Sequence, residues 1–177
     1  MNIGVSIVSK EVREKTADFL LTKPVSRVSI MTSKLLAALA CLVITNIIYL
    51  LITVPMTLTV KTAFSMKIFM MISATLFFVQ LMFVSLGVIV SVIAGNIKSV
   101  ISVSLSTVFG FFVISMLGSV IGDKAVRYIS PFKYFDYEYI IKNAAYETPF
   151  LIVGIIFVIV AIAASYLVYV KKDVHAV

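Results

Sequence analysis

The stretch "FLIVGIIFVIVAIAASYLVYV", Phe150–Val170, decides the fold class because it runs for 21 residues without one charged side chain. An α-helix of this length rises about 30 Å, which matches the hydrocarbon thickness of a bilayer. The run lacks the polar–apolar alternation of a barrel strand, and an open strand would leave backbone groups unpaired in lipid. The stretch therefore predicts a membrane-spanning helix.

Three earlier runs are as long and as apolar, and they cover approximately residues 35–60, 68–94 and 100–121. Over the whole chain 62% of residues are hydrophobic and 13% are charged, whereas soluble domains have roughly 45–50% and about 25%. A water-soluble core cannot bury that much apolar surface, so the surplus must face lipid. We therefore predict an all-α, polytopic membrane protein whose transmembrane domain, residues 35–177, has four spanning helices.

The polar breaks between the runs predict the connections. "KTAFSMK", Lys61–Lys67, is short, and "GNIKS", Gly95–Ser99, begins with a glycine that suits a left-handed helix C-cap. Residues 122–149 form the one long connection, an extracellular loop rich in tyrosine, phenylalanine and lysine. Because such aromatic side chains prefer the headgroup level, we expect one or two short helices at the outer interface.

The distribution of lysine and arginine orients the chain, because cytoplasmic connections of membrane proteins carry an excess of them. With a cytoplasmic N-terminus, nine of the fifteen lie inside: Lys10, Arg13, Lys15, Lys23, Arg27, Lys34, Lys98, Lys171 and Lys172. The other six lie outside: Lys61, Lys67, Lys124, Arg127, Lys133 and Lys142. We therefore predict that both termini are cytoplasmic. The net charge of +7 is then a matter of membrane orientation and indicates no nucleic-acid partner.

Residues 1–34 combine dense mixed charge with a proline, unlike the rest of the chain. Ser9 is suited to cap a helix whose first turns carry Glu11 and Glu14, because acidic side chains are favourable at a helix N-terminus. The residue before Pro24 is pushed out of helical geometry, so this helix ends there. We predict a cytoplasmic amphipathic helix and a proline turn leading into the membrane. Its acidic residues favour docking to a protein over binding to anionic lipid.

Two further expectations concern the ends of this segment. Ser26 is suited to cap a second helix that runs through Lys34 into the first span. The opening "MNIGVSIVS" has no basic residue before its apolar ones, which argues against a cleavable signal peptide. It is more typical of the end of an earlier membrane helix.

Polar side chains at membrane depth are few, and none of them is Asp, Glu, Lys or Arg. Ionisable groups at that depth serve ion-coupled transporters as relays, so their absence argues against a self-powered pump. Asn46 and Gln80 are either partners in interhelical hydrogen bonds or contacts for a substrate. Ser99, Ser102 and Ser106 share one helix face, which either packs closely on another helix or lines a substrate path or dimer seam.

The sequence contains no motif for catalysis or for binding a cofactor or metal. It has one histidine and one cysteine, and neither HExxH nor GxSxG occurs. "GSVIGDK", residues 118–124, has the wrong spacing for a phosphate-binding loop, which needs GxxxxGK followed by Ser or Thr. We therefore predict that the chain is not an enzyme, hydrolyses no nucleotide and binds no cofactor or metal.

"EVREKTADFLLTKPVSRVSIMTSKLL", Glu11–Leu36, resembles the cytoplasmic segment of ABC-2-type transporter permeases. Both have acidic residues, a threonine followed by an acidic or polar residue, a Leu-Leu pair, a Pro-Val-Ser-Arg turn and a lysine that opens the next span. "RYISPFKYFD", Arg127–Asp136, is similar to the Ser-Pro-aromatic element before that family's last span. Such permeases usually have six spans, two of them before the charged segment. The chain thus resembles a permease without its first two spans, as a short or split subunit, a truncated reading frame or a partial chain.

The resemblance implies a division of labour between subunits. Residues 10–23 would be a coupling helix set into a separate ATP-binding subunit, which would hold the ATP and Mg²⁺. The docking residues so implied are Glu11, Glu14, Thr16, Asp18, Phe19, Leu20, Pro24 and Arg27. A second permease copy or a paralogue would complete the path. The aromatic loop would form an outer gate through Pro131, Phe132, Tyr134 and Phe135.

On the same resemblance we expect an exporter in a bacterial plasma membrane. A different class of function stays open: a non-transporting membrane anchor or regulator whose cytoplasmic helix recruits a partner. A neighbouring gene that encodes a phosphate-binding loop would favour transport over anchoring.

Overall fold

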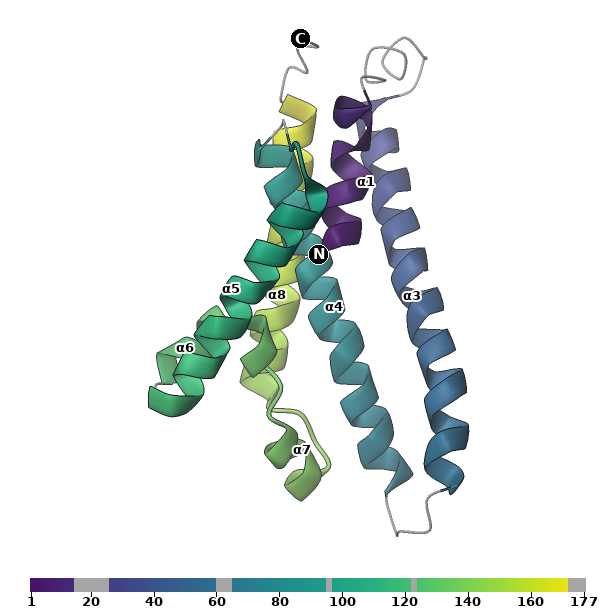
Figure 1. The fold of residues 1–177 in the computed structure, drawn as a ribbon, viewed down its shortest axis with the longest axis vertical. Coiled ribbons are helices and arrows are strands. Elements are labelled where there is room, and N and C mark those ends of the chain that lie inside the picture. The colour runs from purple at the N-terminus through teal and green to yellow at the C-terminus, as the bar shows by residue number, and fades with distance from the viewer. Residues whose placement is uncertain (15–25, 60–64, 95–96, 122–123, 172–177) are drawn as a thin grey trace.

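The computed structural model describes residues 1–14, 26–59, 65–94, 97–121 and 124–171, and all regular elements within these ranges are helices (Figure 1). Four are long and apolar enough to cross a bilayer: α3 (Arg27–Thr59), α4 (Met66–Ala94), α5 (Val100–Ile121) and α8 (Thr148–Lys171). The prediction of an all-α membrane protein with four spanning helices is therefore confirmed.

Shorter helices complete the described chain. Helix α1 (Asn2–Arg13) comes before α3. Helix α6 (Lys124–Ile129), the 3-10 helix η1 (Pro131–Lys133) and helix α7 (Tyr137–Asn143) connect α5 with α8. The long helices lie side by side, and α5 leans away from α3 and α4 toward its C-terminal end (Figure 1).

The two ends of the bundle differ in chemistry. One end, which we call the basic end, carries Arg13 at the end of α1, Arg27 at the start of α3, Lys98 before α5 and Lys171 at the end of α8. The opposite end, which we call the loop end, carries the connection from α5 to α8 (bottom of Figure 1). The charged connection between α1 and α3 therefore leaves and enters the bundle at the basic end.

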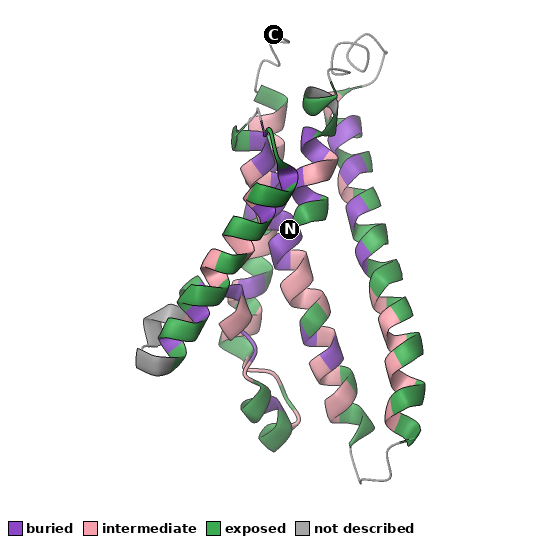
Figure 2. Ribbon diagram, in the orientation of Figure 1, coloured by how far each residue is buried: buried purple, intermediate pink, exposed green. Residues whose placement is uncertain are grey.

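Helix α4 is the centre of the bundle. Over its most apolar 18 residues 44% are buried, against 11%, 11% and 17% for α3, α5 and α8. Figure 2 shows buried positions along α4 and exposed positions on the outer faces of the other long helices. The exposed residues include large apolar ones such as Leu51, Leu105 and Ile159. This pattern suits a bundle whose outer surface is solvated by lipid.

Helix α1 crosses α4 at short range because each helix has a glycine at the crossing. A Cβ at Gly4 would overlap the carbonyl oxygen of Val84, and a Cβ at Gly87 would lie 2.6 Å from the carbonyl oxygen of Met1. Val5 is fully buried beside this crossing. The two backbones are thus in direct contact, as in other small-residue crossings of membrane helices.

The start of α1 corrects one prediction. Because α1 begins at Asn2, Ser9 lies inside the helix, and its hydroxyl donates to the carbonyl four residues earlier at 2.8 Å. The proposed N-cap at Ser9 is wrong, since burial against α4 stabilises an earlier start that local capping rules cannot foresee. Ser26 does cap α3, as predicted, by accepting from the backbone N–H three residues on at 3.2 Å. Residues 15–25, most of the predicted amphipathic helix, lie outside the described residues.

Candidate functional site

In sequence, the predicted docking residues belong to the connection between α1 and α3 or to the helix ends beside it. Five of them lie outside the described residues: Thr16, Asp18, Phe19, Leu20 and Pro24. Of the others, Glu11 falls within α1, Glu14 is exposed directly after α1, and Arg27 is the first residue of α3. The described members therefore flank the charged connection on both sides at the basic end.

The two helices that flank this connection are joined by Lys34 of α3. Its side chain is buried, with 9% exposed, and its ammonium donates to the carbonyl oxygen of Val8 on α1 at 3.5 Å. Met31 is fully buried in the same cluster as Val8. The sequence marks Lys34 only as the lysine that opens a span, because its contact with α1 depends on tertiary packing. Lys34 thus links α1 to α3 near the charged connection.

The structure brings Asn46 and Gln80 together at membrane depth. The Asn46 amide donates to the side-chain oxygen of Gln80 at 2.6 Å and also to the carbonyl of Leu42 in its own helix at 2.8 Å. The Asn46–Gln80 bond joins α3 to α4 beyond the point where the buried cluster of α3 ends. Of the two roles expected from the sequence, the described contacts support interhelical hydrogen bonding.

Removing this bond is expected to loosen α3 from α4 by a modest amount. A double-mutant cycle compares Asn46→Leu, Gln80→Leu and the double variant. We expect a coupling free energy between the two side chains of about 0.6 kcal/mol and at most roughly 1.7 kcal/mol. The free energy of unfolding in detergent or bilayers measures it. Thr45→Val is the control, because within the described part of the chain the Thr45 hydroxyl donates to the carbonyl of Cys41 in its own helix, at 2.7 Å. A coupling indistinguishable from zero would show that the bond adds nothing to the helix contact.

The serine face of α5 does not pack against another helix in the described part of the chain. Ser99 caps α5, accepting from the N–H of Ser102 at 3.3 Å and donating to its hydroxyl at 3.0 Å. Ser102 and Ser106 are exposed, and a Cβ at Gly110 would meet no atom within 4 Å. The described contacts therefore do not support close packing within this chain, and the face is open to lipid or to another chain.

The aromatic loop contains short helices, α6 and α7, as expected, and between them it packs inward on the bundle at η1. Pro131, Tyr134 and Phe135 are buried, and the ring of Phe132 lies 5.0 Å from that of Phe83, near the middle of α4. The element packs against both α4 and α5, where apolar rings find more contact than at the headgroup level. The four residues predicted for an outer gate are thus gathered beside the central helix.

Two tyrosine hydroxyls fix this loop. The Tyr134 hydroxyl donates to the carbonyl of Tyr128 at 2.7 Å, and the Tyr146 hydroxyl donates to the carbonyl of Met71 on α4 at 2.8 Å. Burial raises the pKa of both the Tyr134 and the Tyr146 phenol. The raised pKa favours the protonated hydroxyl that each bond requires, and the stability these bonds contribute is lost only as the pH rises through the raised pKa values.

Arg127 and Glu147 join the two ends of the same loop. The Arg127 guanidinium, on α6, forms an ion pair with the Glu147 carboxylate just before α8. It also lies 4.1 Å from the centre of the Phe150 ring, and its Nε donates to the carbonyl of Lys133 at 3.5 Å. From the sequence these residues count only as loop charges, because their pairing depends on how the loop folds. The pair holds the loop closed at its base.

The described residues contain no group of three His, Cys, Asp or Glu side chains placed to hold a metal ion. Their distinctive features are two joined helices on either side of a charged connection, an apolar bundle and an inward-folded aromatic loop. The family model for the ABC-2 family transporter proteins matches residues 1–174, nearly the full length. No curated protein and no solved structure matches the chain.

Proposed function

Because the chain belongs to the ABC-2 family of transporter proteins, we propose that it is the permease subunit of an ATP-driven exporter in a bacterial plasma membrane. Family membership and four spanning helices make it a multi-pass membrane component of a transporter. Permeases of this family normally work with an ATP-binding subunit. ATP and Mg²⁺ would bind to that subunit, since the sequence has no phosphate-binding loop of its own.

The proposed docking site for the ATP-binding subunit is residues 10–23, which begin in the last turn of α1 and continue into the charged connection. The observation that carries it is the contact between Lys34 and the carbonyl of Val8, which joins the helices on either side of this connection. A displacement of the connection would reach α1 and α3 along the backbone, and that contact would couple the two helices to each other. The basic end would face the cytoplasm, in accordance with the excess of lysine and arginine there. The C-terminus would lie on that side, whereas Met1 lies within the bundle beside Gly87 of α4.

The proposed path lies between this chain and a second permease copy or paralogue. The open face of α5 with Ser102 and Ser106 supports this, because the described chain leaves it uncovered. At the loop end, Phe132, Tyr134 and Phe135, together with Pro131, would form the outer gate. Their packing on α4 would let the gate respond to movement of the central helix.

The docking proposal predicts that reversing acidic charges in the connection weakens the complex. With Glu14→Lys/Asp18→Lys, we expect affinity for an ATP-binding subunit, sought among the neighbouring genes, to fall at least about tenfold, because opposite charges at a docking surface become like charges. Co-purification of the two subunits from detergent, titrated with the ATP-binding subunit, measures this loss.

The matched control is Glu138→Lys. Glu138 is equally acidic but lies on α7 at the loop end, in an exposed pair with Lys142 at 3.9 Å. This variant should leave co-purification unchanged. Wild-type affinity in the double variant would refute docking through these carboxylates. A genome with no gene for an ATP-binding subunit nearby would instead favour the anchor or regulator.

A further inference from the structure

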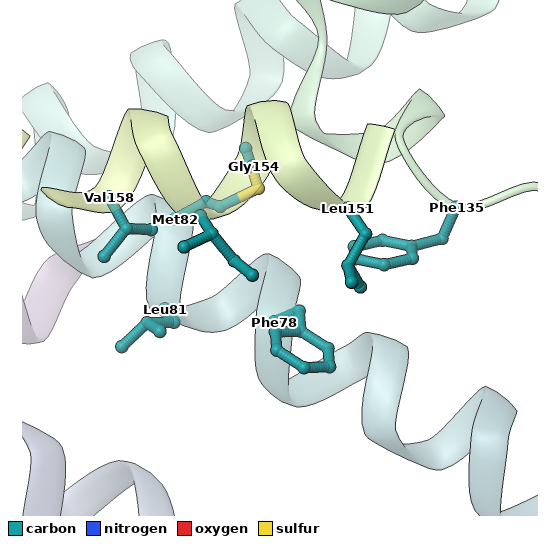
Figure 3. Close-up of a pocket in the computed structure, with 8 residues that line it drawn as sticks. Phe78, Leu81, Met82, Phe135, Leu151, Gly154 and Val158 are labelled. Atoms are coloured by element: carbon teal, nitrogen blue, oxygen red, sulfur yellow. The ribbon is translucent and has the colours of Figure 1, made fainter. Parts of the chain in front are cut away.

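The pockets between α4 and α8 differ in chemistry. One, of about 80 Å³, lies beside Gly154, and its wall is entirely apolar (Figure 3). The other, of about 550 Å³, is an open groove at the basic end, which we call the end groove. It is lined by Ile93 of α4 and by Leu167, Val168 and Lys171 of α8. The end groove therefore combines apolar side chains with a positive charge, and its ligand must offer a chemistry that suits both.

The end groove runs from a charge into apolar surface along the helix axes. The run without charged residues in α8 ends at Val170, so Lys171 marks the place where this spanning helix leaves the apolar region. Ile93 lies one residue before the end of α4, which is also a spanning helix. Leu167 precedes Lys171 by four residues, which at 1.5 Å per residue places it about 6 Å further along the span. The ammonium therefore lies at the membrane surface, with the apolar side chains directly beneath it.

The end groove opens outward from the bundle. Ile93 is 64% exposed and Leu167 is 62% exposed, although both belong to helices that can span a membrane. In a bilayer, lipid chains cover such outward-facing apolar side chains. Lys171 is exposed as well, and among the described residues none forms an ion pair with it. Its ammonium can therefore bind the headgroup of the same lipid whose chain covers the groove.

We propose that the end groove binds an anionic phospholipid, with the lipid phosphate on the Lys171 ammonium and the first acyl carbons on Ile93 and Leu167. A lysine binds phosphate as a point charge. The other cations of the basic end, among them Arg13 and Lys98, add to the attraction for a lipid of net negative charge. A zwitterionic lipid such as phosphatidylcholine gains less, because its own ammonium group offsets its phosphate. The groove thus selects for the net charge of the headgroup.

Photo-labelling tests the proposal with the full chain in phosphatidylcholine nanodiscs. Two probes carry a diazirine at the same acyl carbon close to the glycerol, one on phosphatidylglycerol and the other on phosphatidylcholine, and each is added at the same low mole fraction. After irradiation, mass spectrometry maps the adducts. We expect the phosphatidylglycerol probe to label Ile93 and Leu167 several-fold more than the phosphatidylcholine probe does. Equal labelling by the two probes would overturn the proposal.

Variants of Lys171 show whether the preference depends on its charge. With Lys171→Gln, labelling by the phosphatidylglycerol probe should fall to the level of the phosphatidylcholine probe, whereas labelling by the latter should not change. Lys171→Arg keeps the charge and should keep the preference.

The matched control is Lys142→Gln, which removes an exposed lysine of α7 at the loop end. This variant should leave labelling of Ile93 and Leu167 unchanged. A preference for phosphatidylglycerol that survives Lys171→Gln would overturn the site. No ATP-binding partner is needed for any of these measurements, so their outcome is independent of the proposed transport function.

Discussion

Gly87→Ala is expected to lower the free energy of unfolding by about 1–3 kcal/mol, which is the usual cost of overpacking a close contact. The added Cβ would lie 2.6 Å from the carbonyl oxygen of Met1 and 3.0 Å from the amide nitrogen of Val5. Both are backbone atoms, so no side chain can rotate to relieve the clash, and α1 must shift as a whole. Gly4→Ala should cost a similar amount, because its Cβ would overlap the carbonyl of Val84.

Equilibrium unfolding of the purified protein in mixed micelles measures this loss. The control is Gly110→Ala, whose Cβ would meet no atom within 4 Å. That change should be neutral or stabilising by up to about 1 kcal/mol, since alanine is the better helix former. The double variant Gly4→Ala/Gly87→Ala should lower the free energy of unfolding by less than the sum of the two single losses, because both substitutions disturb the same helix crossing. Equal stabilities for the Gly87 and Gly110 variants would contradict the close crossing.

Arg127→Ala is expected to destabilise the loop end by about 1–3 kcal/mol. The change leaves the Glu147 carboxylate without its partner in a site where only 21% of its side chain is exposed, and unpairing a partly buried charge is costly. It also removes the guanidinium from the face of Phe150. Arg127→Lys should recover only part of the loss, because a point-like ammonium cannot reproduce the planar contact.

The solvent-exposed ion pair on α7 provides the control for the partly buried pair of Arg127 and Glu147. Lys142 and Glu138 lie 3.9 Å apart with 75% and 85% of their side chains exposed. Lys142→Ala should therefore change stability by less than about 0.5 kcal/mol. Thermal unfolding and the rate of proteolysis within residues 124–147 measure both variants. If Arg127→Ala and Lys142→Ala behave alike, the ion pair does not hold the loop closed.

The four spanning helices could be predicted from the sequence because length and hydropathy are sufficient for a helix in lipid. Asn46 and Gln80 show that one kind of tertiary contact is also foreseeable. Two amides within otherwise apolar spans have few possible partners, and interhelical bonding was one of the two roles expected for them. Ser26 was predictable as a cap for a different reason, since its hydroxyl acts on the next turn of the same helix.

The features that the sequence did not predict depend on contacts between residues far apart in the chain. Ser9 has the right neighbours for an N-cap, yet α1 starts earlier because Gly4 meets Gly87 on another helix. The aromatic loop forms short helices as expected, but the packing of Phe132 on Phe83 could not be predicted from its composition. At these positions the local sequence indicates only an intrinsic structural preference, whereas burial against α4 decides which structure forms.

The crossing of α1 over α4 makes the two sides of the charged connection unequal in stiffness. On one side, α1 meets α4 backbone to backbone, where nothing can rotate to absorb a displacement. On the other side, the first turns of α3 are held by side chains such as Met31 and Lys34, which can rotate, and beyond Leu42 no described residue of α3 is buried. The same pull would therefore displace α3 more than it displaces α1, and α1 would carry α4 with it.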